Sequence, residues 1–240
     1  MNDQTESAKK FDASRAGEYE RQARVALAGY DACHELTACV LSAALGGGSA
    51  ARVLVAGAGG GAQEIVTAAA LEPNWRFTAV DPSRPMMDIA VERLREHGLL
   101  ERTAVVYGTV DDLPEGEAFD AATLIGVLHH MPGDDAKRAI LGALARRLKP
   151  GAPLALAGNR FAYASQPLLM AAWGARWRQQ GAGPEEVIAR RAKILQGADP
   201  PHSDAAVAAL LSDSGFEAPL PYFSSLFWGA WIARRRLPPA

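Results

Sequence analysis

The stretch Val53-Leu54-Val55-Ala56-Gly57-Ala58-Gly59-Gly60-Gly61 decides the fold of this chain. Its apolar first half predicts a short buried strand, and its alternating glycines predict a tight turn. A helical pattern begins at once and continues to Leu71, and a second apolar run, residues 77–80, ends in Asp81. A strand, a glycine turn, a helix, a strand and a terminal acid together form a nucleotide-binding βαβ unit.

The chemistry of this unit indicates the class of its ligand. Glycine has no Cβ, so the turn lets the backbone approach a ligand closely. The N-terminus of the following helix offers free N–H groups to polar ligand atoms. The carboxylate of Asp81 can accept hydrogen bonds from both hydroxyls of a ribose. The unit therefore predicts an adenosine-containing ligand and leaves open which one.

The class of protein is limited by the length, composition and charge of the chain. With 240 residues, 49% of them hydrophobic and 22% charged, the chain is long enough for one α/β domain with a modest helical addition. A formal net charge of −2 argues against a nucleic-acid partner bound by phosphate neutralisation. Cys33 and Cys39 lack the spacing of a zinc site, and no metal is predicted.

Two further observations bear on location. Residues 1–10 are polar and charged and lack the apolar core of a signal peptide. No stretch of the sequence approaches the length of a membrane span. We therefore expect a cytoplasmic protein with reduced thiols and no membrane partner.

Strands and helices alternate strictly through the middle of the chain. The predicted strands are residues 52–56, 77–80, 103–107, 118–125 and 153–157. This alternation predicts an α/β fold with a Rossmann-like, doubly wound sheet of five parallel strands. Two β-like runs at the end, residues 217–224 and 226–235, leave no room for a crossover helix. They predict an antiparallel C-terminal hairpin that closes the sheet.

Helical patterns flank this core. Residues 11–45 predict N-terminal helices, with Leu36 among the expected buried positions, and residues 165–195 predict another helical stretch. We divide the chain into an N-terminal helical cap, residues 1–48, and a main domain, residues 49–240. Within the main domain, a helical lid insert is expected at about residues 162–200.

Two tryptophans mark the expected lid. Trp173 and Trp177 are four residues apart and share one face of a helix. They could stack on a flat substrate or shield a cation. The alternative, which we prefer, is that they form an ordinary apolar stripe that packs on the domain.

Three later segments narrow the choice of ligand. Gly108-Thr109-Val110-Asp111-Asp112-Leu113-Pro114 follows the third strand, Leu128-His129-His130-Met131-Pro132 follows the fourth, and Leu148-Lys149-Pro150-Gly151 precedes the fifth. Together with the glycine turn, this ordered set resembles the class I S-adenosylmethionine-dependent methyltransferases, especially the small-molecule branch similar to the ubiquinone and menaquinone C-methyltransferases. The resemblance is strong over residues 50–158, and the closing hairpin is compatible with it.

The resemblance implies a set of residues that bind S-adenosylmethionine. They are Gly57, Ala58, Gly59 and Gly61 around the methionine part and ribose, Asp81 at the ribose hydroxyls, Pro82, Ser83 and Met86 beside the adenine, Thr109, Val110 and Asp111 at the other adenine edge, Gly126 and Val127 along the sulfonium, and Tyr19 closing over the cofactor.

Two positions depart from the family pattern. Val55 stands where the family usually has an acid that helps to hold the amino group of the cofactor. Glu64 or an N-terminal residue such as Tyr19 is the candidate replacement. Thr109 stands where the family often has Asp, so recognition of adenine is expected to rest on Asp111 and on backbone groups.

Methyl transfer is an in-line displacement at a methyl carbon that a sulfonium already activates. The protein mainly aligns the acceptor and excludes water, and an acceptor hydroxyl or carbon acid also needs a base. His129 and His130 are the catalytic candidates, because they follow the fourth strand, where open α/β sheets place their ligands. The resemblance to phenolic O-methyltransferases implies His129 as the base. The alternative is that both histidines shape the loop and contact only cofactor or backbone.

The sequence thus predicts an enzyme that transfers a methyl group from S-adenosylmethionine to O, N, S or C of a small molecule. The first alternative is an NAD-dependent oxidoreductase, because Gly57-x-Gly59-x-x-Ala62 also fits the dehydrogenase fingerprint. The second is a catalytically silent S-adenosylmethionine-binding partner subunit, supported by the missing acid at Val55. Aromatic residues between Phe223 and Trp231 leave open a homodimer edge or packing on the sheet.

Overall fold

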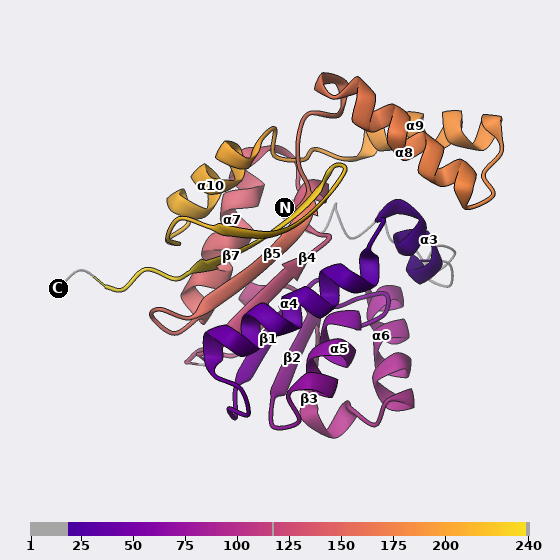
Figure 1. Cartoon of the computed structure of the whole chain (residues 1–240). Coiled ribbons are helices and arrows are strands. Elements are labelled where there is room, and N and C mark those ends of the chain that lie inside the picture. The colour runs from indigo at the N-terminus through magenta and orange to yellow at the C-terminus, as the bar shows by residue number, and fades with distance from the viewer. Residues whose placement is uncertain (1–18, 117, 239–240) are drawn as a thin grey trace.

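The computed structural model of the chain describes residues 19–116 and 118–238. Its strands form one sheet in the order β3-β2-β1-β4-β5-β7-β6 (Figure 1). Their bounds are β1 Arg52–Ala56, β2 Arg76–Asp81, β3 Thr103–Tyr107, β4 Ala121–Ile125, β5 Pro153–Asn159, β6 Leu220–Ser225 and β7 Trp228–Arg234. The first five strands are parallel, and β7 lies antiparallel between β5 and β6. The predicted parallel sheet with a closing hairpin is confirmed.

Helices cover both faces of the sheet (Figure 1). One layer holds α4 Tyr30–Leu45, α5 Gln63–Leu71 and α6 Arg84–Glu96, and the other holds α7 Gly133–Arg147 and α10 Asp204–Asp213. Side chains alternate between the faces of a strand, so Val53 and Val55 pack with the first layer while Leu54 packs with the second. Two covered faces explain why β4 and β5 are buried along their whole length.

The predicted N-terminal helical stretch divides into two helices within the described residues. The first is α3, Tyr19–Ala26, and the second is α4. The break falls at Gly29, whose φ of +84° suits glycine and interrupts a right-handed helix. Leu36 is 41% exposed, contrary to our expectation, because α4 turns Cys33, Thr37 and Leu41 toward the interior instead. Residues 11–18 of the predicted stretch lie outside the described residues.

The predicted lid insert consists of α8, Pro167–Gln179, and α9, Pro184–Gly197. The break between them contains Gly181, whose φ is +93°, and Pro184, which can begin a helix but not continue one. Both helices lie near α3, beyond the end of the sheet (Figure 1). Trp173 and Trp177 are almost completely buried, as the packing interpretation of these residues requires.

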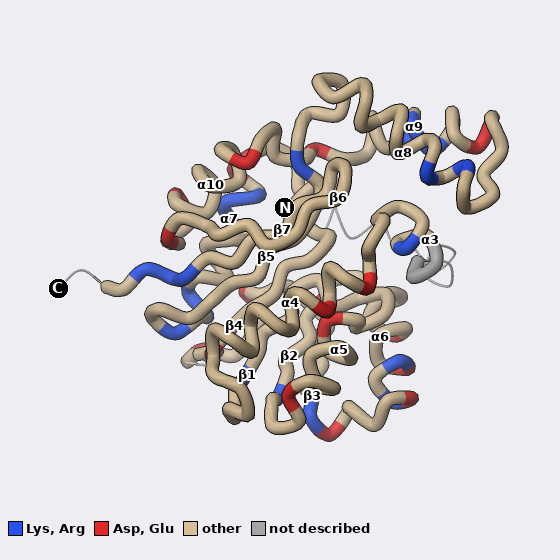
Figure 2. Tube along the Cα trace, in the orientation of Figure 1, with Lys and Arg blue, Asp and Glu red and all other residues tan. Residues whose placement is uncertain are grey.

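In the part of the chain that the structure describes, four 3-10 helices connect the larger elements: η1 Leu100–Arg102, η2 Val110–Asp112, η3 Leu128–His130 and η4 Tyr163–Ser165. Charged residues of both signs are distributed over the helices, and the central strands carry them only near their ends (Figure 2). Among the described helices, none has the length and apolar character that a membrane span needs.

Candidate functional site

A cavity that is open to solvent lies at the carboxyl ends of the central strands. Open α/β sheets bind ligands at such a place, where consecutive crossovers leave in opposite directions. The lining residues come from five segments: Ala56, Gly57 and Gly59 after β1; Val80, Asp81, Pro82, Ser83 and Met86 at β2 and α6; Gly108, Thr109 and Val110 after β3; Ile125, Gly126 and Val127 at β4; and His130, Met131 and Ile140 beyond it.

The glycine turn forms one wall of this cavity. Neither Gly57 nor Gly59 has room for a side chain. Gly57 has a φ of +75°, and a Cβ on it would lie 2.3 Å from Cγ2 of Val127. A Cβ on Gly59 would lie 2.7 Å from Oδ2 of Asp81. The Gly57 N–H donates to the Val80 carbonyl at 2.8 Å, which holds the turn against β2. Backbone atoms therefore face the cavity directly.

Asp81 ends β2 and is held in one orientation. Its Oδ2 accepts a hydrogen bond from the Gly59 N–H at 3.0 Å, and its Oδ1 accepts one from the Ser83 N–H at 2.8 Å. Burial raises the pKa of Asp81 above its usual value, and these two hydrogen bonds offset that effect only in part. Each carboxylate oxygen keeps a second lone pair, which is what a pair of ribose hydroxyls needs.

The segment after β3 differs in detail from the sequence prediction. Thr109 and Val110 line the cavity, but Asp111 does not. The Asp111 carboxylate instead pairs with Arg146 of α7 at 3.0 Å. Asp112, which is not one of the predicted cofactor-binding residues, accepts hydrogen bonds from the Thr109 N–H and hydroxyl. This capping box shapes η2, and its two hydrogen bonds hold the pKa of Asp112 below its usual value.

The two histidines of η3 occupy different environments. His130 lines the cavity. His129 is buried and is not among the lining residues. Its ring centroid lies 4.2 Å from that of His130 and 5.5 Å from that of Trp228. The Asn159 N–H donates to Nδ1 of His129 at 3.4 Å, which places the proton of a neutral ring on Nε2. Of the two predicted candidates, His130 is the one on the cavity wall.

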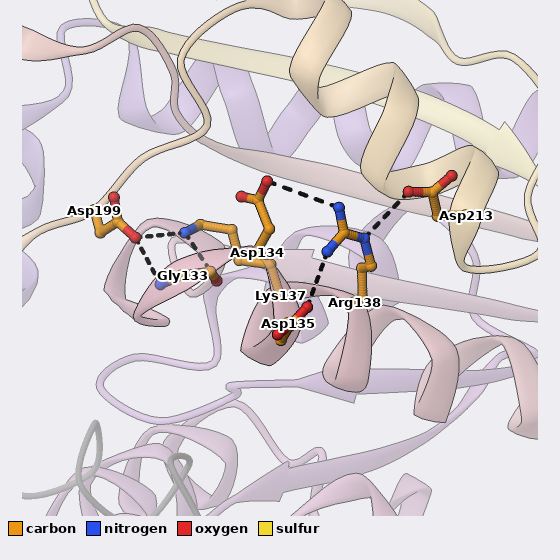
Figure 3. Close-up of polar contacts among 7 residues, drawn as sticks. All are labelled: Gly133, Asp134, Asp135, Lys137, Arg138, Asp199 and Asp213. Carbon is orange, nitrogen blue, oxygen red and sulfur yellow. Dashed lines mark hydrogen bonds and ion pairs between the residues drawn. The ribbon is translucent and has the colours of Figure 1, made fainter.

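Asp199 follows α9 at the end of residues 167–199, which we call the α8–α9 arm, and it holds the segment around His129 and His130 in place. The Asp199 N–H donates to the His129 carbonyl at 2.8 Å, and Oδ2 of Asp199 accepts from the Gly133 N–H at 2.7 Å and from Nζ of Lys137 at 2.8 Å. Figure 3 shows Asp199 facing Gly133 and Lys137 at the start of α7. Burial raises the pKa of Asp199, but the hydrogen bond from Lys137 and that from Gly133 outweigh it, so the pKa is lowered. The contacts bracket His130 and Met131, which line the cavity.

Several predicted residues lie away from the cavity lining. Ala58 is buried under the turn, and Gly61 is buried where the turn leads into α5. Tyr19 begins α3, and its side chain lies outside the described part of the structure. Trp173 packs against Phe227, with its Nε1 donating to the Ala26 carbonyl.

No group of three or more His, Cys, Asp or Glu side chains gathers as a metal site among residues 19–116 and 118–238. The cavity instead offers backbone atoms, apolar side chains, the Ser83 and Thr109 hydroxyls, the His130 imidazole and one carboxylate. These residues fit S-adenosylmethionine or its product: Gly57 and Gly59 bring the backbone to the cavity wall, and Asp81 presents acceptors for two hydroxyls.

Comparison with known proteins agrees with this geometry. Residues 54–154 match the family described as a methyltransferase domain. The structure is similar to a possible exported protein from Bordetella parapertussis, with a TM-score of 0.64 and 17% identity over 85% of this chain and 67% of that one. It is similar to human N-acetylserotonin methyltransferase in complex with SAM, with a TM-score of 0.59 and 18% identity over 85% of this chain and 51% of that one.

A third similar structure is the 1,6-didemethyltoxoflavin-N1-methyltransferase of Burkholderia thailandensis with bound 1,6-didemethyltoxoflavin and S-adenosylhomocysteine. Its TM-score is 0.58, with 23% identity over 86% of this chain and 79% of that one. At these low sequence identities, the structural similarity shows a shared fold and no more. This chain spans only about half of the human enzyme.

Proposed function

We propose that this protein uses S-adenosylmethionine to methylate a small molecule, through the part of the chain, residues 54–154, that matches the methyltransferase domain. The observation that carries the proposal is the cavity formed by the glycine turn, the carboxylate of Asp81 and the segment after β4. S-Adenosylmethionine supplies a methyl group on a sulfonium, the electrophile of the reaction.

The residues of the cavity have three tasks in this proposal. The backbone at Gly57 and Gly59 cradles the methionine part and ribose, and Asp81 binds the ribose hydroxyls. Ile125 and Val127 present apolar surface toward the reacting end of the cavity, which limits access of water. Alignment of the acceptor atom with the C–S bond can contribute several kcal/mol of the barrier reduction.

We assign removal of an acceptor proton to His130 rather than to His129. His130 lines the cavity, whereas Nδ1 of His129 already accepts a hydrogen bond from Asn159. If the acceptor carries a hydroxyl, His130→Gln should reduce kcat, because the variant lacks a group that can accept the acceptor proton. His129→Gln should instead act mainly through stability, and equal loss of kcat in both variants would contradict the assignment.

The helices at the end of the sheet are proposed to cover the acceptor. Nε1 of Trp173 in α8 donates to the carbonyl of Ala26 in α3, so the predicted cap, residues 1–48, and the predicted lid, residues 162–200, meet there. The nature of the methylated atom, a homodimer, the absence of a nucleic-acid partner and a cytoplasmic location stay predictions. The narrower likeness to the ubiquinone and menaquinone enzymes also stays a prediction.

Ligand-induced thermal stabilisation tests the cofactor assignment. We expect S-adenosylmethionine and S-adenosylhomocysteine to raise the melting temperature by a few degrees, since a ligand at a hundredfold its Kd stabilises by about 2.7 kcal/mol. NAD(H) should produce no shift. Transfer of isotope-labelled methyl to a panel of phenols, amines, thiols and heteroaromatic compounds then tests catalysis. A shift with NAD(H) alone would contradict the proposal, and binding without transfer to any acceptor would support the silent-subunit alternative.

A further inference from the structure

Two neighbouring residues at the carboxyl end of β5 each bury a polar atom that has no partner among residues 19–116 and 118–238. These atoms are Oδ1 of Asn159 and Nε1 of Trp228. Asn159 ends β5, Trp228 begins β7, and the two residues pair directly across these antiparallel strands. Directly paired residues project their side chains from the same face of a sheet. An acceptor and a donor without partners are therefore neighbours.

Buried atoms of this kind have a cost that a ligand can remove. A buried polar group is unfavourable unless it is hydrogen-bonded, and nearly all such groups in native proteins have a partner. Asn159 is only 8% exposed, and its Nδ2 donates to the Tyr163 hydroxyl at 2.8 Å. That hydrogen bond fixes the amide and leaves Oδ1 as an acceptor on its other side. The indole Nε1 of Trp228 can only donate.

Direct contacts place this pair next to the cavity. The Asn159 N–H donates to Nδ1 of His129 at 3.4 Å, and the Trp228 ring meets the His129 ring edge to face, with centroids 5.5 Å apart. The His129 ring in turn lies 4.2 Å from that of His130, which lines the cavity. Trp228 also packs on the cluster that contains Ile125, another lining residue. The pair is thus separated from the cavity by one layer of side chains.

The partner of Asn159 connects the pair to the α8–α9 arm. Tyr163 packs against Trp173 of α8, with ring centroids 6.1 Å apart, and against Phe227 in the turn between β6 and β7, at 5.0 Å. Asn159 therefore lies between the cavity, where the cofactor is proposed to bind, and the helices that are proposed to cover the acceptor.

Backbone strain gathers at the same place. Outside the glycine turn, the described non-glycine residues with a left-handed backbone are Phe161, with a φ of +69°, and Leu226, with a φ of +50°. Phe161 follows Asn159 by two residues, and Leu226 precedes Trp228 by two. Bulky residues avoid this conformation, and strain of this kind is concentrated at ligand sites. The strain agrees with a binding role for the residues between these two positions.

We propose that Asn159 and Trp228 bind the polar edge of the methyl acceptor, with Oδ1 of Asn159 accepting from an N–H and Nε1 of Trp228 donating to the adjacent carbonyl oxygen. This role rests on the proposed function and narrows its acceptor to a planar cyclic amide, a lactam. A lactam carries N–H and C=O on adjacent atoms, and its flat ring suits the aromatic neighbours. A phenol with one hydroxyl cannot use it both here and at His130, where its proton would be removed.

The indole N–H signals of the tryptophans report directly on this contact. The chain has five tryptophans, so the ¹H–¹⁵N spectrum of the labelled full chain contains five such signals, and Trp228→Phe identifies that of Trp228. The protein is saturated with S-adenosylhomocysteine and titrated with 2-pyridone, 2-quinolone and 1-isoquinolone. We expect the Trp228 signal to move downfield as it gains an acceptor. The signal of Trp75, whose Nε1 already donates to Oγ of Ser49 before β2, should stay in place.

The N-methyl derivatives of the same lactams are the ligand controls, because they keep the ring and the carbonyl but lose the N–H. Their Kd values, from the same titrations, should be at least tenfold higher, as loss of a hydrogen bond to a buried acceptor implies. This comparison uses the wild type alone, so it does not depend on the folding of any variant.

Asn159→Leu removes the amide while nearly keeping the side-chain volume. It should weaken the lactams to the level of their N-methyl derivatives, while the Kd of S-adenosylhomocysteine changes less than twofold. The matched control is Asn74→Leu, which makes the same change before β2, at the opposite end of the sheet. It should leave every Kd unchanged.

Two results would overturn this role and leave the methyltransferase proposal intact, because S-adenosylhomocysteine is already bound in these samples. One is a Trp228 signal that none of the three lactams moves, and the other is equal Kd values for the lactams and their N-methyl derivatives. Equal weakening of the lactams and of S-adenosylhomocysteine in Asn159→Leu would also overturn it, since Asn159 would then act through the structure as a whole. Failure of the wild type to bind S-adenosylhomocysteine would overturn both proposals.

Discussion

At the scale of single residues, Gly57 determines the shape of the cavity through the side chain that it lacks. We expect Gly57→Ala to lower both the stability and the affinity for S-adenosylhomocysteine. Its left-handed backbone costs about 1–2 kcal/mol for alanine, and the new Cβ would lie 2.3 Å from Cγ2 of Val127. Denaturant unfolding and calorimetric titration measure the two losses.

Gly98→Ala is the matched control for that variant. Gly98 also has a positive φ, +67°, but no atom lies within 4 Å of a Cβ placed on it. It should therefore lose stability through the backbone alone and keep its ligand affinity. Equal affinity losses in the two variants would mean that the contact between Gly57 and Val127 does not shape the binding site.

At the scale of elements, the contact between Lys137 and Asp199 joins the α8–α9 arm to the cavity wall. Lys137 is 1% exposed, whereas the Asp199 side chain is 47% exposed. Asp199→Ala removes the carboxylate that pairs with the buried Lys137 ammonium and should cost about 3 kcal/mol of stability. Lys137→Met leaves a carboxylate that water can still reach, so it should cost less. Equilibrium unfolding in urea measures both.

The neighbouring contact between Arg138 and Asp213 provides the control, because it also links α7 to another element but lies on the surface (Figure 3). Asp213→Ala should change stability least of the three variants. Asp199→Ala should also weaken S-adenosylhomocysteine, since Asp199 brackets His130 and Met131. Unchanged affinity in Asp199→Ala would remove the link between the arm and the cavity.

These elements also show what the sequence could predict. Local sequence patterns mark the strands, the glycine turn and the acid of β2, so these patterns predict both the sheet and the position of its cavity. The pairing of Lys137 with Asp199 joins residues 62 positions apart, and no local pattern encodes it. The same holds for Asp111, which a surface pairing with Arg146 draws away from the adenine side. Tertiary contacts decide which of two adjacent residues, such as His129 and His130, reaches the cavity.

At the scale of the whole molecule, the pKa of Asp81 is shifted in the opposite direction from the pKa values of Asp120 and Asp199. Asp120 links the start of β1 to the turn between α7 and β5, accepting from the Arg52 N–H and from Lys149. Burial raises its pKa, but Lys149 and Arg52 outweigh that effect, and the pKa of Asp120, like that of Asp199, is lowered from 3.8. The stability that these two contribute is present above pH 3.8 and is lost as the pH falls below it. Burial instead raises the pKa of Asp81 above 3.8.

This difference predicts the order in which the protein loses binding and structure on acidification. Protonation of Asp81 removes an acceptor for the ribose hydroxyls and, because its pKa is raised, occurs at a higher pH than protonation of Asp120 and Asp199. We therefore expect affinity for 5′-methylthioadenosine to fall before the protein unfolds, as calorimetry and circular dichroism between pH 7 and about pH 3 can measure. Asp81→Asn should flatten the affinity profile above pH 4, and simultaneous loss of binding and structure in the wild type would show that Asp81 does not control binding.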